Sequence, residues 1–471
     1  MTQADAPSLI LSDLRHRRRA EIRNVIAMAI PSVITTSSRA VMDVADFIMI
    51  TYLPTDRAQA AILPSQMIMW SYTAIGLGIV TMVNTFAAQA LGRQQHRECS
   101  AYAWQSLYLG IAFGILGAVL IPLVPTVIHL IGLEPSVQTL QIQYLQIALL
   151  TPGPTIAAHG LGFFFIGVHR PWITTWSAIE ANVVNIAAGI VLIFGYCGFE
   201  PMGIAGAAWA MLIALSYRAI RLVAALLAPS VARVFESRST WRPSWSRMGS
   251  LLRVGSPNGF QWSSEVVVWA VFVNLLIGRR FGTADLIATS TAWQYMRLSF
   301  LPPTGVGQAL TALVGRSIGA GDIRRALREA RWANVLTVGY MGLLSVVYTV
   351  FGTQLVGLFN RDPNVMTVGG RVMICAAVFQ LFDALAITYA GALRGAGDTF
   401  VPAIFFVAST WIIILGGGWF MAQTFPQLGS LGPWLAAATL IAVTALFLWW
   451  RWNGRAWMKI DLFRARSEPR P

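Results

Sequence analysis

The 471 residues are 56% hydrophobic and only 11% charged, and their mean hydropathy is +0.61. A soluble globular protein carries roughly 25% charged residues, so this chain could not cover its own surface in water, and a soluble globular class is excluded. The net charge of +14 does not indicate nucleic-acid binding. The basic residues lie in short clusters between long apolar runs, as membrane topology requires.

Twelve apolar stretches follow a basic segment, residues 1–23, that lacks the apolar core and cleavage site of a signal peptide. Each stretch reaches the length of about 20 residues that a spanning helix needs. The first six are predicted at 24–50, 60–90, 101–128, 138–167, 172–196 and 203–228. A hydrophilic linker, 229–249, precedes the other six, which are predicted at 250–278, 286–317, 328–358, 366–393, 400–422 and 430–451. The tail is 452–471.

Basic residues predict which ends of these helices face the cytoplasm. With the N-terminus inside, about 27 of the 34 Lys and Arg residues fall in inside segments and about five in outside segments. The largest inside group runs from Arg218 to Arg253 around the linker. This asymmetry follows the positive-inside rule for an even number of spans, so we expect both tails to be cytoplasmic.

The two halves of the chain look related at a shift of about 227 residues. Pro31 in the first span corresponds to Pro257 in the seventh. The segment TFAAQALGRQQHRE (85–98) corresponds to ALVGRSIGAGDIRR (312–325), and FFFIGVHRP to GALRGAGDT. Since six helices per half is an even number, this is a parallel repeat. The predicted fold is an all-α membrane protein of two six-helix bundles, 24–228 and 250–451, with a substrate site between them near mid-membrane.

Ionisable residues inside the predicted spans are the most informative part of the sequence. A charge at the bilayer centre costs about 2.5–3.5 kcal/mol on insertion scales, so such residues usually have a function. They are Asp43 and Asp46 in the first span, Glu180 in the fifth, Glu265 in the seventh and Asp383 in the tenth, with Arg39 and Arg297 as the bases.

Arg39, Asp43 and Asp46 share one face of the first helix. One interpretation is that this face lines a central cavity. The other is an internal ion pair between Arg39 and Asp43, with Asp46 near the outer end in contact with water. The sequence leaves both open.

The seventh helix carries a polar stripe of Asn258, Gln261, Glu265 and Trp269, which is typical of a hydrated cavity wall. In the tenth helix, Asp383 lies in an apolar run. A desolvated carboxylate can hold a proton in one conformation and exchange it for a cation in another, which is the simplest chemistry for an antiporter.

Two features qualify this prediction for the acids. Phe379, one turn before Asp383, could offer a π surface to a cation. The alternative for Glu265 and Asp383 is a structural ion pair with Arg297 that never changes protonation.

At these residues the sequence resembles the multidrug and toxic compound extrusion (MATE) family over nearly its whole length. Pro31 with VADFIM, which contains Asp46, and GSPNGFQWSSE, which ends at Glu265, match motifs of the first and seventh helices. LPPTGVGQALTALVGRSIGAGD (301–322) and QLFDALAITYAGALRGAGDT (380–399) are the most specific matches.

The resemblance implies a V-shaped pair of bundles with alternating access. It also implies that Glu265 and Asp383 form a cation site for Na⁺ or H⁺. Phe379 stands where some members have a cation-contacting tyrosine, so that hydroxyl ligand is lost. Asn182 and Asn185 match the asparagine-rich pattern of the fifth helix.

We therefore expect a secondary active antiporter, not an enzyme, that exports organic cationic or amphipathic molecules in exchange for H⁺ or Na⁺. We expect it to act as a monomer in a bacterial inner membrane, with small-molecule substrates and lipid as partners and no cofactor besides the ion. The alternative is a lipid-linked oligosaccharide flippase, for which basic cavity residues would bind pyrophosphate. The residues predicted to line the cavity are Asp46, Asp43, Arg39, Asn182, Asn185, Asn258, Gln261 and Arg297.

Overall fold

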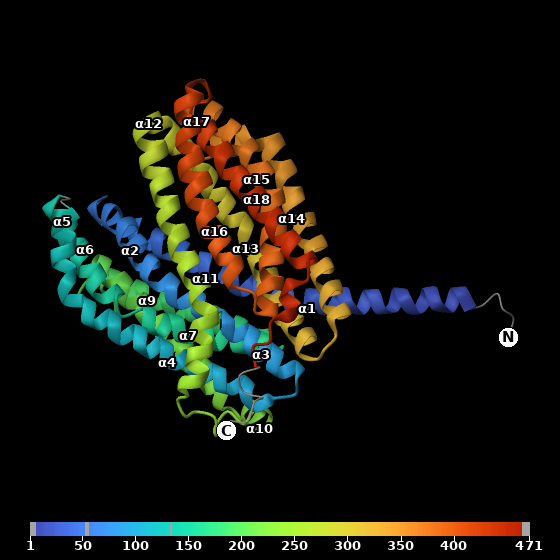
Figure 1. The fold of residues 1–471 in the computed structure, drawn as a ribbon. Helices are drawn as coiled ribbons and strands as arrows, with labels where there is room; N and C mark the ends of the chain where they lie inside the picture. The colour runs from blue at the N-terminus through green and yellow to red at the C-terminus, as the bar shows by residue number, and fades with distance from the viewer. Residues whose placement is uncertain (1–5, 52–55, 132–133, 464–471) are drawn as a thin grey trace.

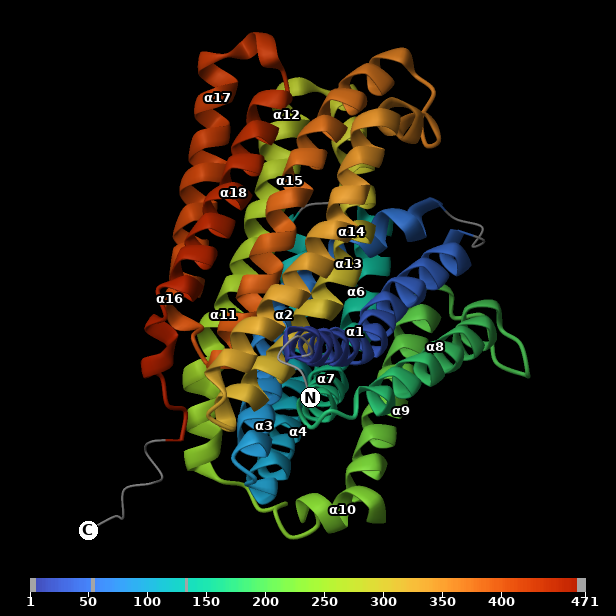
Figure 2. The ribbon, with the colours of Figure 1, turned by 90° about the vertical axis from the view of Figure 1, so that its right-hand side faces the viewer.

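The protein is described by a computed structural model that covers residues 6–51, 56–131 and 134–463. Within these ranges the regular structure is entirely helical. The helices form two groups that meet at one end and diverge at the other, so that the molecule is V-shaped (Figure 1). Figure 2 shows the second group side-on, with α14, α15 and α18 lying roughly parallel.

The first bundle contains the helices up to α9, and a short helix, α10 (Pro229–Phe235), follows it. Its members are α1 (Ala6–Thr51), α2 (Asp56–Val80), α3 (Met82–Gly92), α4 (His96–Leu120), η1 (Ile121–Leu123), α5 (Val124–Ile131), α6 (Pro135–Ala148), α7 (Pro152–Gly167), α8 (Pro171–Phe194) and α9 (Gly203–Leu227).

The second bundle begins with α11 (Trp245–Val271). Two of its helices contain a π-helical segment, η2 and η3. Its other members are η2 (Phe272–Gly278), α12 (Arg279–Phe281), α13 (Thr283–Gly319), α14 (Ile323–Gly357), α15 (Pro363–Ala396), α16 (Phe400–Ser409), η3 (Thr410–Gly417), α17 (Gly418–Thr424), η4 (Pro426–Leu428), α18 (Leu431–Asn453) and η5 (Ala456–Lys459).

Each of the twelve predicted spans falls on one of these helices or on a helical run. In the described ranges, ten helices are long and apolar enough to cross a membrane, and α6 with α7 forms an eleventh span that is bent by 44°. The eighth predicted span, 286–317, is α13, which contains Pro302 and Pro303. This helix is long enough to cross a membrane, but it is more polar than the ten helices counted above, so hydropathy alone does not identify it as a span.

Two segments predicted to lie outside the spans are partly helical. Residues 1–23 are predicted as a tail, but α1 begins at Ala6 and runs into the first span without a break. Glu21 on this extension pairs with Arg328 of α14 at 2.7 Å, so the extension contacts the second bundle. The linker 229–249 is also partly helical, because it contains α10 and the start of α11.

The two bundles are joined where α2 and α3 pack against α11 and α13. A Cβ atom on Gly78 would lie only 2.4 Å from Cα of Gly259, so glycines allow the two backbones to touch here. Asn84 donates to the carbonyl of Gln308 at 2.9 Å, and Gln89 donates to the carbonyl of Gly395 at 2.9 Å. These amide–carbonyl bonds close the vertex of the V.

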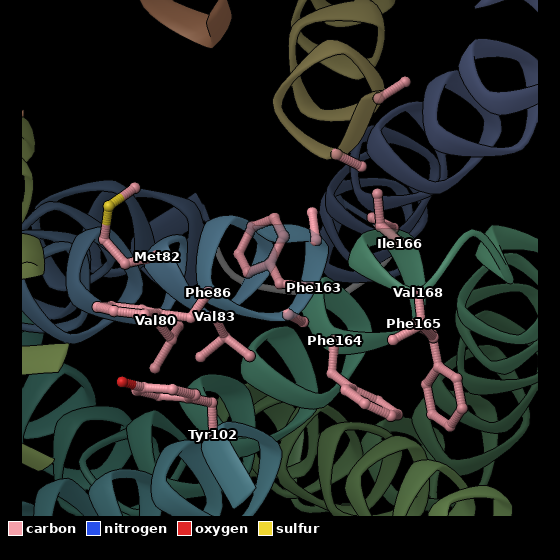
Figure 3. Close-up of a cluster of buried hydrophobic side chains, with 14 of the residues drawn as sticks. Val80, Met82, Val83, Phe86, Tyr102, Phe163, Phe164, Phe165, Ile166 and Val168 are labelled. Carbon is pink, nitrogen blue, oxygen red and sulfur yellow. The ribbon is translucent and has the colours of Figure 1, made fainter. Parts of the chain in front are cut away.

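Packing at the vertex is apolar and dense. Phe86 stacks on Tyr102 with ring centroids 4.2 Å apart, and both are fully buried. Figure 3 shows this pair beside Phe163 and Phe164 of α7. The same core cluster includes Leu310 of α13, so it continues into the second bundle.

The bundles separate towards the opposite end, near α5 in one and α12 in the other (Figure 1). Between α2 and α11 an apolar groove of about 330 Å³ opens on this side of the vertex, lined by Met67, Ile68 and Val266 among others. The structure is therefore closed at one end of the helices and open at the other.

Candidate functional site

The polar face of α1 looks towards the second bundle. Asp43 Oδ1 accepts from Arg39 Nε at 3.0 Å, and Asp43 Oδ2 pairs with Arg297 Nη2 of α13 at 3.1 Å. All three side chains keep between a third and a half of their surface accessible. The predicted ion pair between Arg39 and Asp43 is present, and it lies where the two bundles face each other, so the two interpretations of this face are compatible.

Asp46 is turned into the first bundle. It is only 8% exposed, and Asn185 of α8 donates to its Oδ1 at 2.5 Å. The expected contact of Asp46 with water at the outer end is therefore not found. One turn earlier on α8, Asn182 donates to the carbonyl and the hydroxyl of Ser38 at 2.8 and 2.7 Å. The two asparagines tie α8 to α1 along its length.

Glu180 does not join this group. It pairs with Arg221 Nε of α9 at 3.2 Å and accepts from the hydroxyl of Tyr217 at 3.1 Å. Its charge is therefore balanced between α8 and α9.

Glu265 of α11 and Asp383 of α15 lie close enough for their charges to act on each other. Both are partly accessible. The indole of Trp269, one turn after Glu265, lies within hydrogen-bonding reach of that carboxyl group and packs on Trp293 at a centroid distance of 4.4 Å. Glu265 thus lies beside an aromatic wall inside the second bundle.

No ion pair joins either acid to a basic side chain among the residues that the structure describes. Arg297, the alternative partner considered for them, is held by Asp43 of the other bundle. A structural pair of Glu265 or Asp383 with Arg297 is therefore not formed in this conformation.

The other predicted residues of the second bundle are placed differently. Phe379 is buried, 8% exposed, in the apolar core that contains Phe272. Asn258 lies in the seam, where its amide donates to the carbonyl of Gly78 and the hydroxyl of Thr81 at 3.1 and 2.9 Å. It does not line the site, because α2 covers its side chain. Gln261 is partly accessible.

Two carboxyl groups whose charges act on each other, without a nearby base, favour the uptake of a cation or a proton. Within the described ranges, no group of three or more His, Cys, Asp or Glu side chains is placed so that it could hold a metal ion. The arrangement suits a single monovalent ion that is taken up and released.

A family model described as MatE matches residues 31–191 and 264–419, which include Asp43, Asp46, Glu180, Glu265 and Asp383. The chain belongs to the MatE family. One matched segment lies in each bundle.

Relatives of this MatE chain are similar over almost their full length. It is 29% identical over 450 residues to a probable multidrug resistance protein NorM from Rhizobium meliloti (strain 1021), which covers 94% of this chain and 95% of the relative. It is 30% identical over 441 residues to the protein of the same description from Brucella suis biovar 1 (strain 1330), with coverages of 90% and 91%.

Solved structures share the fold at lower identity. An outward-facing conformation of a multidrug resistance MATE family transporter of the MOP superfamily superposes with a TM-score of 0.84 at 18% identity, over 94% of this chain and 97% of that one. A MOP superfamily transporter from Pyrococcus furiosus gives a TM-score of 0.81 at 18% identity, with coverages of 93% and 97%.

Sequence reasoning missed two basic groups of this MatE protein. Arg218, assigned to the inside segment around the linker, lies within α9 and is 9% exposed. His159 of α7 is near it. The signal for Arg218 was available, because the residue falls within the predicted span 203–228.

Proposed function

We propose that this MatE protein is a secondary active antiporter that exports organic cationic or amphipathic molecules in exchange for H⁺ or Na⁺. The observation that carries the proposal is the pair Glu265 and Asp383, two partly accessible carboxyl groups whose charges act on each other and which have no basic partner among the described residues. The tryptophan pair Trp269 and Trp293 forms an aromatic wall beside Glu265. The relatives described as probable multidrug resistance proteins support the choice of cargo.

Transport uses alternating access of the two bundles. The closed end of the V carries the short basic loops near Arg93 and Arg316, so we place this end in the cytoplasm of a bacterial inner membrane. Both chain termini then face the cytoplasm, and the present conformation is open to the outside. One chain contains both bundles, so a monomer suffices.

Exchange follows from the charge of the site. With the site open to the outside, an incoming monovalent cation lowers the negative charge of Glu265 and Asp383 by one. The less charged site lets the bundles close over it, because a desolvated pair of carboxylates without a cation would be costly. Phe379 offers no oxygen ligand, which favours H⁺ over Na⁺ as the coupling ion.

The flippase alternative is less well supported. Its pyrophosphate-binding bases would be Arg39 and Arg297, and the same carboxylate, Asp43, holds both. In this conformation Asp43 already offsets part of the positive charge that would attract a diphosphate.

The test is efflux of ethidium from vesicles that contain the full-length protein, with pH and Na⁺ gradients imposed separately. Glu265→Gln and Asp383→Asn should each abolish gradient-driven efflux while the protein remains in the membrane. Glu200→Gln, which changes an exposed loop acid, is the control and should transport normally. Normal efflux by both site variants would refute the assignment.

A further inference from the structure

Arg218 is a buried guanidinium without a partner inside the first bundle. It lies on the face of α9 that also carries the fully buried Ala214 and Leu222. It is 9% exposed, and its Nε is buried with no hydrogen-bond partner. Neither a hydrogen bond nor an ion pair joins its side chain to any residue that the structure describes.

The acids of this bundle do not compensate it. Asp43 is shared by two other arginines, and Asp46 accepts from Asn185. Glu180 is paired with Arg221, which is the next arginine on α9. An uncompensated charge inside a membrane protein is costly, and such charges are retained mainly where they meet a substrate or an ion.

Two further basic side chains on neighbouring helices lie within electrostatic range of Arg218. The charges of Arg218 and of Arg39 on α1 both act on His159 of α7, and Arg39 also acts on Arg218. His159 Nδ1 donates to the carbonyl of Thr155 at 2.9 Å. A carbonyl oxygen can only accept, so the hydrogen bond uses Nδ1 of His159 as the donor and leaves Nε2 available for another partner.

The cluster is reached from the space between the bundles. Arg39 keeps a third of its side-chain surface accessible, and its partner Asp43 is bound across the gap by Arg297. His159 is also partly accessible. A ligand group that enters along α1 meets the basic cluster on the side of α7 and α9.

We propose that Arg218 and His159 form an anion subsite that binds the carboxylate of the cargo. The planar guanidinium fork matches a carboxylate in a bidentate manner, and such charge-assisted pairs are strong when desolvated. The negative charge of a bound carboxylate favours the protonated form of His159, which then donates from Nε2 as a second contact. The preferred cargo is then zwitterionic, with its carboxylate at this subsite. The inference rests on the proposed export function and narrows its substrate class.

A matched pair of dyes tests the subsite. Rhodamine 110 carries a free carboxyl group, and rhodamine 123 is its methyl ester. Binding of both dyes to purified full-length protein in detergent is measured by fluorescence anisotropy. We expect the wild type to bind rhodamine 110 more tightly than the ester. Arg218→Gln should lower the affinity for rhodamine 110 about ten- to a hundredfold and that for the ester less than about twofold.

Three further variants separate a binding role from a structural one. Arg218→Lys keeps the charge and should restore part of the preference for rhodamine 110. His159→Gln should reduce that preference more weakly, and it keeps the test decisive if the Arg218→Gln protein does not fold. Arg221→Gln is the matched control, because this neighbouring arginine is paired with Glu180, and it should leave both affinities unchanged.

Equal wild-type affinity for the two dyes would overturn the proposal. So would an equal loss for both dyes in Arg218→Gln and His159→Gln. Competition by inorganic phosphate that removes rhodamine 110 and depends on Arg218 would assign the subsite to a free anion instead. The assay contains no ion gradient, so a failure of the coupling site at Glu265 and Asp383 would show in efflux and not here.

Discussion

Replacing Gly78 by alanine should weaken the closed vertex of the V. The new Cβ would lie 2.4 Å from Cα and 2.5 Å from N of Gly259, whereas ordinary contact begins at 3.4 Å. Because both neighbours are backbone atoms, no side chain can move aside, and the bundles must part by about 1 Å at this point. Overpacking of this kind costs about 1–3 kcal/mol, which shifts a two-state equilibrium about 5- to 150-fold.

The shift can be measured as chemical accessibility at the vertex. Thr85 is fully buried there and donates to the carbonyl of Arg394 at 2.8 Å. In a background without native cysteines, Thr85→Cys should react with an impermeant maleimide about 5 to 150 times faster when Gly78→Ala is added. Gly339→Ala is the matched control, because a Cβ there meets no atom within 4 Å. Unchanged labelling in the Gly78 variant would refute the reasoning.

Three smaller predictions follow from single contacts. Arg297→Gln removes the ion pair with Asp43 between the bundles. Because both groups are partly exposed, the open state should be destabilised by only about 0.2–1 kcal/mol. The change in its population is measured from the distances between spin labels on the two bundles. Asp398→Asn leaves the mostly buried Arg451 without its bidentate partner at 2.6 and 3.0 Å and should lower the free energy of unfolding by about 3–5 kcal/mol, while unchanged thermal unfolding would contradict this. Burial, together with nearby arginines, lowers the pKa of His169, in the loop between α7 and α8, from 6.5 to about 4. Protonation therefore favours the unfolded chain, so stability should be full above pH 6.5 and fall between pH 6.5 and 4, and His169→Gln should remove this part of the pH dependence.

Apolar runs predicted the order of most of the helices, because lipid demands long apolar segments whatever their partners are. The span 286–317 also falls on a helix, α13, although its two prolines and Arg297 make it too polar to be selected by hydropathy alone. Apolar runs could not locate the start of α1, since a basic amphipathic segment such as 1–23 reads as a tail until its contact with α14 is known.

The sequence marks the ionisable residues of the candidate site but not their pairings. A single sequence marks Asp43 and Arg297 as costly inside a membrane, yet their contact depends on how two bundles dock. For the same reason Asn258 looked like a cavity residue until α2 was found covering it. The partners of Glu265 within its own helix, by contrast, were set by helical spacing, and Trp269 lies where the stripe predicted it.

The two ion pairs of Asp43 affect the energy barrier for movement of one bundle relative to the other. Arg39 lies on the same helix as Asp43, one turn away, whereas Arg297 belongs to the opposite bundle. When the bundles swing apart at this point, Arg297 leaves and Arg39 stays, so the carboxylate keeps a counter-charge throughout the stroke. A conformational cycle that never strands an anion in hydrocarbon has a lower barrier than one that must break its only ion pair.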